Sequence, residues 1–196
     1  MSLMARDSGG GDFELAPTGN HVARCYQIVD LGMQKSTYNN EERIAHKVLI
    51  GWELPTVLME DGRPFSINNR YTLSLHENAA MTAVLQSWRG RSFTDDERAG
   101  FDLHTILGAT CMLNVVHNPS GSRTYANVDT VTPVPQGLDC PAAVNANMKY
   151  SIEEHTDAEF MALPEWMRNT INRGDAESSG PPAQDPNDFP NDDVPF

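Results

Sequence analysis

The stretch "IAHKVLIGWEL", residues 44–54, is the part of this sequence that decides the fold. It is rich in β-branched and large apolar side chains, which favour a strand. Gly51 lies inside it, and a glycine within a strand often marks a bulge or a sharp bend. Small barrels need such bends. The segment therefore predicts a bent strand in a small, strongly curved sheet.

Two similar segments flank this strand. Residues 21–33, "HVARCYQIVDLGM", precede it, and residues 65–75, "FSINNRYTLSL", follow it. Both are rich in β-branched and aromatic residues, which predicts two further strands. The polar residues 34–43 predict a loop between the first two strands, and Asp61-Gly62 predicts a turn before the third.

The hydrophobic period changes after the third strand. Ala80, Val84, Leu85 and Trp88 recur at helical spacing, and Gly90 follows where a helix would end. This pattern predicts an amphipathic helix whose apolar side faces the core.

A second, shorter helix is predicted from the capping box formed by Thr94 and Glu97. Strand-like composition then returns in residues 110–117 and 122–134. Between them, "NPSG" at 118–121 has the composition of a β-turn.

The predicted order is therefore three strands, a helical region and two strands. This is the order of an OB-fold, a five-stranded Greek-key barrel that commonly binds oligonucleotides. We expect a mainly β fold with such a barrel in residues 13–135 and helices between strands 3 and 4. Other α+β arrangements fit the same order of elements.

The residues outside the predicted barrel divide into three segments. Residues 1–12 are Gly-rich and polar, which predicts a disordered arm. Residues 136–173 predict a linker and a helical extension, with a capping box at Thr156 and Glu159 and a kink or a fresh turn at Pro164. We expect this extension to pack back on the barrel through an apolar stripe. The stripe consists of Met161, Trp166, Met167 and Ile171.

Acidic residues are concentrated toward the end of the chain. The net charge is −13, from 14 basic and 27 acidic side chains. Residues 1–150 account for −4 and residues 151–196 for −9. Residues 174–196 contain six carboxylates, no basic residue, and many Gly, Pro and Ser. Such a segment buries too little apolar surface to offset its ordering entropy, so we expect a disordered acidic tail.

The sequence lacks the signals that are typical of several other classes of protein. The three cysteines are widely separated and form no disulfide framework, which suits free thiols in the cytoplasm. No apolar run is long enough to cross a membrane, and no signal peptide is visible. Neither a metal-ligand pattern nor a cofactor or nucleotide motif occurs. We therefore expect no metal, no cofactor and no enzymatic activity.

The segment "DFPNDDVPF", residues 188–196, resembles the C-terminal tip of bacterial single-stranded-DNA-binding proteins. Those tips have an acidic run followed by a small apolar residue, proline and a final phenylalanine. Asn191 departs from an all-acidic run. The residues assigned to a partner-binding tip by this resemblance are Asp188, Phe189, Asp192, Asp193, Val194, Pro195 and Phe196.

Residues 13–135 resemble phage-encoded single-stranded-DNA-binding proteins. The resemblance lies in the segments "ARCYQIVDLG", "WELP", "YTLSL" and "SWRGRSFTDDERAGFDL". It implies a phage or prophage protein in the cytoplasm of a bacterial host cell. The implied partners are single-stranded DNA and, through the tip, enzymes of replication, recombination and repair. Such tips bind by burying the terminal ring while a basic residue meets its carboxylate. The sequence leaves open whether the protein forms a homo-oligomer.

Sequence-tolerant binding to a single strand needs a positive groove and aromatic rings on which bases stack. The predicted strands and their loops contain candidates for both. Trp52 and Tyr71 fit a place in the core equally well, and Trp88, Phe93 and Phe101 are expected to be core residues. The candidates for DNA binding are Arg24, Tyr26, Lys35, Tyr38, Arg43, Lys47, Trp52, Arg70, Tyr71, Arg123 and Tyr125.

Two other functions remain as alternatives. The first is an OB-fold adaptor that binds protein or RNA and mimics the host recruitment tail without strong DNA binding. The net charge of −4 in residues 1–150 favours it, since nucleic-acid-binding domains are usually basic. The second is a nuclease, but nucleases gather carboxylates around Mg²⁺, and the acidic residues here fall mainly in turns, helix starts and the tail.

Overall fold

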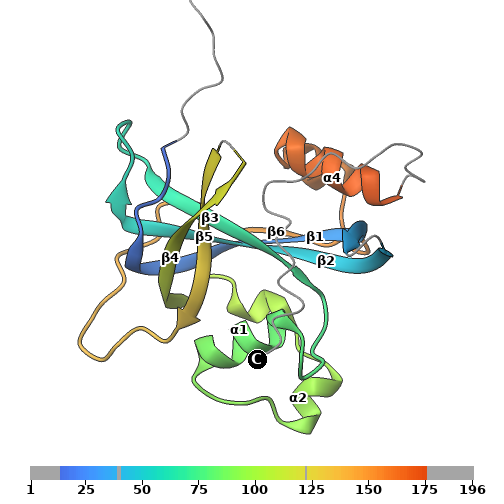
Figure 1. Cartoon of the computed structure of the whole chain (residues 1–196), viewed down its shortest axis with the longest axis horizontal. Coiled ribbons are helices and arrows are strands. Elements are labelled where there is room, and N and C mark those ends of the chain that lie inside the picture. Colours follow the sequence, from blue (N-terminus) through green and yellow to red (C-terminus); the bar gives the residue numbers. More distant parts are fainter. Residues whose placement is uncertain (1–13, 39–40, 122, 176–196) are drawn as a thin grey trace, which may run out of the picture.

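An antiparallel sheet forms the centre of the molecule (Figure 1). The computed structural model describes residues 14–38, 41–121 and 123–175. The five main strands follow the order β3-β2-β1-β4-β5, and β6 pairs in parallel with the middle of β1. The strands are β1 (Gly19–Tyr38), β2 (Glu41–Leu58), β3 (Pro64–Thr72), β4 (Thr110–Ser120), β5 (Arg123–Thr132) and β6 (Met148–Tyr150).

The predicted mainly β fold, with helices between the third and fourth strands, is confirmed. Six strands are present in the described residues rather than five, because β6 was not predicted. The sheet is open, with β3 and β5 as the end strands of its hydrogen-bonded path. The helices are α1 (Ala80–Arg89), α2 (Asp95–Ala99), α3 (Asp157–Ala162) and α4 (Glu165–Asp175), with a 3-10 turn at Leu103–Ile106.

The loop predicted for residues 34–43 is wrong. β1 continues to Tyr38 and β2 begins at Glu41, and these two residues pair in register. Lys35 and Arg43 are exposed in this extension. A hairpin that projects from the core does not need an apolar face, so its sequence lacks the alternation by which strands are recognised.

The turn predicted at 118–121 is also misplaced. β4 continues through Asn118 and Pro119 to Ser120, and Asn118 pairs with Tyr125. The chain reverses one step later, around Gly121, whose φ is +60°.

Gly51 lies opposite a bulge, as its position in the strand predicted. The register between β1 and β2 shifts between Cys25 and Gln27, and Gln27 is the partner of Gly51. A Cβ atom at position 51 would lie 2.8 Å from Oε1 of Gln27. Any other residue at position 51 would therefore require the Gln27 side chain, which lies over this strand, to shift.

The main core lies between the inner face of the sheet and α1. Trp52 of β2 packs against Trp88 of α1, with ring centroids 5.9 Å apart. The Trp88 ring also donates a 2.9 Å hydrogen bond to the backbone oxygen of Thr110. The predicted helix is confirmed, including its end at Gly90, which has φ of +67°.

A second core lies on the outer face of the sheet. There, Leu31 and Leu49 pack against residues of β6, α3 and α4. Figure 1 shows α4 and α1 on opposite sides of the sheet. The continuous apolar run at residues 48–50 reflects this arrangement, because the middle of β2 is buried on both faces.

The C-terminal extension packs back on the sheet, as predicted. Pro164 separates α3 from α4, and the backbone N–H of Met167 donates to its carbonyl oxygen. The predicted stripe is only half right, since Met167 and Ile171 are buried but Met161 and Trp166 are 63% and 43% exposed.

The predicted extension ended at residue 173, but α4 continues to Asp175. The disordered N-terminal segment predicted for residues 1–12 lies outside the described residues. So does nearly all of the predicted tail, residues 176–196. None of the helices in the described part of the chain is long and apolar enough to span a membrane.

Candidate nucleic-acid interface

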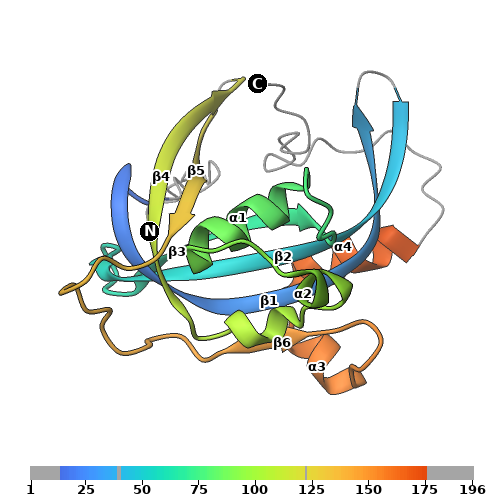
Figure 2. The same ribbon diagram turned by 90° about the horizontal axis from the view of Figure 1, so that it is seen from below.

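Two β-hairpins extend beyond the core and are called arms here. The β1–β2 arm comprises residues 33–38 and 41–46, and the β4–β5 arm comprises residues 116–121 and 123–127. Figure 2 shows that both arms curve toward the same side of the molecule, one on each side of α1. The two arms therefore extend from the core in the same general direction.

The β1–β2 arm contains three of the predicted candidates. Lys35 and Arg43 are exposed, and Tyr38 is the last residue of β1. The register places Lys35 opposite Ile44 and Ser36 opposite Arg43. The two basic residues therefore occupy neighbouring cross-strand positions on opposite faces of the arm.

The β4–β5 arm contains Arg123 and Tyr125, which were predicted to share one side. They occupy alternate positions of β5, opposite Ser120 and Asn118. Arg123 is exposed and Tyr125 is half-buried. A cation and an aromatic ring thus belong to one face of the arm.

The outer face of β2 and β3 contains Lys47 and Arg70, both half-buried. The Nζ atom of Lys47 donates a 2.9 Å hydrogen bond to Oγ1 of Thr72, its register partner. The guanidinium carbon of Arg70 lies 6.0 Å from the ring centroid of Trp166. Trp166 was not predicted as a site residue.

Arg24 and Tyr26 lie in the half of β1 away from its arm. Arg24 donates hydrogen bonds to the backbone oxygens of Gly108, at 3.0 Å, and Pro141, at 2.8 Å. Tyr26 hydrogen-bonds Ser66, and burial raises the pKa of its hydroxyl. Both side chains therefore hold neighbouring segments of the protein against β1.

Trp52 and Tyr71 do not belong to an exposed interface, and their assignment as stacking residues is wrong. Their exposed fractions are 0% and 3%. Both occupy positions of β2 and β3 that face α1, where they form part of the main core. Burial raises the pKa of Tyr71 far above that of a solvated tyrosine.

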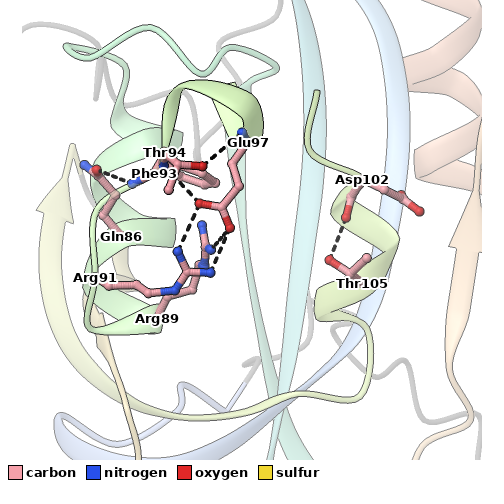
Figure 3. Close-up of polar contacts among 8 residues, drawn as sticks. All are labelled: Gln86, Arg89, Arg91, Phe93, Thr94, Glu97, Asp102 and Thr105. Atoms are coloured by element: carbon pink, nitrogen blue, oxygen red, sulfur yellow. Dashed lines mark hydrogen bonds and ion pairs between the residues drawn. The ribbon is translucent and has the colours of Figure 1, made fainter. Parts of the chain in front are cut away.

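Three other arginine and aromatic side chains gather next to α1 (Figure 3). Arg89 and Arg91 both donate to the carboxylate of Glu97, and Arg89 also lies over the ring of Phe93 at 4.5 Å. Glu97 in turn accepts from the backbone N–H of Thr94, which completes the predicted capping box. This cluster joins α1 to α2, so its cations have a structural role.

The described residues contain three free cysteines and no cluster of possible metal ligands. Cys25 and Cys111 are buried, Cys140 is half-buried, and all three are free. Burial raises the pKa of the Cys25 thiol to about 12, so it stays protonated at neutral pH. In this part of the chain, no three His, Cys, Asp or Glu side chains group so as to hold a metal ion.

Trp166 was missed because the sequence suggested that it belongs to the buried stripe. The residues of the extension that are buried, Leu163, Met167 and Ile171, follow one another at intervals of four. Trp166 precedes Met167 and therefore points away from this line. The four-residue spacing of these apolar residues was the sequence signal that could have separated Trp166 from the buried stripe.

No known protein-family profile matches the chain, and no curated protein matches it either. Exposed or half-buried cations occur on both arms and on the outer face of β2 and β3. Aromatic rings accompany them on the β4–β5 arm and at α4, a combination suited to a polyanion with stackable rings.

Proposed function

We propose that this protein binds single-stranded DNA without sequence preference. The observation that carries the proposal is the pair of arms on one side of the molecule, with Lys35 and Arg43 on one and Arg123 and Tyr125 on the other. Cations neutralise phosphates, and aromatic rings stack on any base because every base has a π-face. Neither contact reads sequence.

The topology supports an OB-fold as the framework of this function. The strand order and the position of α1 between β3 and β4 agree with that fold. Cα atoms of the end strands β3 and β5 approach within 8 Å, where an OB barrel closes. OB-folds bind their ligands with strands 2 and 3 and with the 1–2 and 4–5 loops, which correspond to the two arms here.

We further propose that residues 188–196 recruit replication, recombination and repair proteins. The support is the resemblance of this segment to the tips of bacterial single-stranded-DNA-binding proteins, and it lies outside the described residues. In this proposal the protein has neither a catalytic activity nor a cofactor. It acts in the cytoplasm of a bacterial host cell. Deleting the acidic tail should tighten DNA binding at low salt, because the tail competes with DNA for the basic arms.

The test is a fluorescence-anisotropy titration of labelled oligo-dT at several salt concentrations. The full chain is compared with a chain that ends after Asp175, the last residue of α4. We expect binding that weakens with salt at a log–log slope of about −0.7 per phosphate contacted. Equal low-salt affinities of the two chains would contradict competition by the tail.

A parallel titration with oligo-rU and an assay for Mg²⁺-dependent cleavage separate the alternatives. If neither chain binds oligo-dT, the single-strand proposal fails. Binding to oligo-rU alone would then support an adaptor that binds RNA, and cleavage of the oligonucleotide would support a nuclease.

A further inference from the structure

We propose that Trp166 and Arg70 form a stacking platform for a base of single-stranded nucleic acid, on the face of the sheet opposite α1. The inference deepens the proposed function and depends on it. It adds a residue from the C-terminal extension to an interface that otherwise belongs to the strands and arms.

The packing of α4 against the sheet determines the position of the Trp166 ring. Met167 and Ile171 of this helix are 2% and 3% exposed and fix it against the outer face of the sheet. On the same helix, the indole of Trp166 stays 43% exposed. The helix is therefore held rigidly while one large aromatic ring is presented to solvent, so little entropy is lost when a base stacks on it.

Arg70 supplies a cation beside this ring. Its guanidinium carbon lies 6.0 Å from the indole centroid, within the range of a cation–π interaction. Arg70 belongs to β3, and its register partner Leu49 is buried in the second core beneath α4. The pair thus joins the edge strand of the sheet to the C-terminal helix. A base that stacks on the indole would bring its phosphate within reach of the guanidinium.

The positive charge continues along the same face. Lys47 is the register partner of Thr72, so Lys47 and Arg70 are diagonal neighbours, about 7–8 Å apart. Arg43 lies four residues before Lys47 on β2, and the alternation of the strand places it on the same face, in the β1–β2 arm. A line of cations therefore leads from Trp166 to the arm. This line is complementary to the charge of a polynucleotide backbone.

Acidic side chains belong to the same elements as this line, among them Glu165 on α4 and Glu53 on β2. Glu165 precedes Trp166 and lies in the first turn of α4, where a carboxylate is stabilised by the helix dipole. Glu53, on the same face of β2, is fully buried and accepts hydrogen bonds from the backbone N–H groups of Val144 and Asn145. Glu53 is therefore engaged with backbone donors and is not exposed on this face.

Tryptophan fluorescence isolates this site. The chain has three tryptophans, and Trp52 and Trp88 are 0% and 6% exposed. A base that stacks on Trp166 should quench the emission of that residue alone. The experiment titrates the full chain with unlabelled oligo-dT and follows tryptophan emission. The affinity of the same protein is measured by anisotropy with labelled oligo-dT.

We expect the wild-type emission to fall on binding. In Trp166→Ala the quenching should disappear, and the affinity should fall roughly 5- to 150-fold, the equivalent of one stacked base. Trp166→Phe should keep most of the affinity without the quenching. The control is Leu58→Ala, which removes a side chain that is 57% exposed on β2. It should bind as the wild type does, and circular dichroism verifies the fold of each variant.

The outcomes separate this inference from the proposed function. Binding without quenching, together with wild-type affinity in Trp166→Ala, would overturn the platform and leave single-strand binding intact. Absence of binding by every variant and by the wild type would overturn both. If Trp166→Ala changes the oligomeric state measured by light scattering but not the affinity, the exposed indole is a self-association contact, and the platform is likewise overturned.

Discussion

The carboxylate of Glu53 accepts a 2.7 Å hydrogen bond from the backbone N–H of Asn145, 92 residues further along the chain. The same carboxylate accepts from the Nδ2 atom of Asn145, at 2.9 Å, and from the backbone N–H of Val144, at 3.1 Å. A carboxylate is tolerated in a buried position only when its oxygens are satisfied in this way. The interaction holds the connection between β5 and β6 against β2.

Glu53→Gln should therefore destabilise the protein. Glutamine keeps one acceptor oxygen but places an NH₂ group against backbone donors, which leaves a buried donor without a partner. We expect a loss of about 1–3 kcal/mol in the free energy of unfolding, measured by urea titration. Glu42→Gln, at an exposed position, serves as the control. Equal urea midpoints for the two variants would show that the buried bonds contribute nothing specific.

The ion-pair cluster around Glu97 predicts a loss of stability in acid. Arg91, the backbone N–H of Thr94 and Arg89 lower the pKa of this carboxyl from 4.5 to about 2. Because the pKa is lower in the folded state, the stabilisation is complete above about pH 4.5 and is lost as the pH falls through about 2. In Glu97→Gln, the free energy of unfolding should change less steeply with pH in this window.

The measurement is a series of urea unfolding curves between pH 2 and pH 6. Glu60→Gln, which removes an exposed carboxylate, should keep the pH dependence of the wild type. Identical slopes for Glu97→Gln and the wild type would mean that the cluster does not couple proton binding to folding.

The cysteines should differ in their reactivity toward a thiol reagent at pH 8. Burial raises the pKa of Cys25 to about 12 and that of Cys111 also well above its usual range. Partial burial also raises the pKa of Cys140, but this thiol is only half-buried, whereas Cys25 and Cys111 are fully buried. We expect Cys140 alone to react in the folded protein and all three thiols to react in denaturant. Cys140→Ser should abolish labelling of the folded protein. Labelling of a second thiol in the folded wild-type protein at pH 8 would contradict the burial of Cys25 and Cys111.

The two arms should contribute separately to DNA binding. Arg43→Gln and Arg123→Gln each remove an exposed cation from one arm. Each change should weaken binding to oligo-dT and reduce the salt slope by about 0.7, the value for one phosphate contact. Lys149→Gln, on β6 and away from both arms, is the charge-matched control. If all three variants bind alike, the arms do not contact the strand.

Interactions between residues close in sequence were predictable. The capping boxes of Thr94 with Glu97 and of Thr156 with Glu159 are both present. The helix that ends at Gly90 also forms where the hydrophobic spacing placed it. Such features depend on side chains three or four residues apart, so the sequence contains everything that determines them.

The candidate site was only partly predictable. Arg123 and Tyr125 share a face because alternation along one strand guarantees it. Trp52 and Tyr71 looked equally suited to the core and to an interface, and the structure places both in the core. Strand alternation identifies two faces, but it does not say which of them a helix will cover.

The sequence alone determined the local elements, the two capping boxes and the segregation of charge into the final residues, because each depends on near neighbours or on composition. Only the tertiary structure decided that residues 33–38 and 41–46 form the β1–β2 arm, that Trp52 is buried and that Trp166 is exposed. Burial is set by whatever packs on each face from elsewhere in the chain. Here α1 covers the inner face and α4 the outer one, and their positions follow from contacts between residues far apart in sequence.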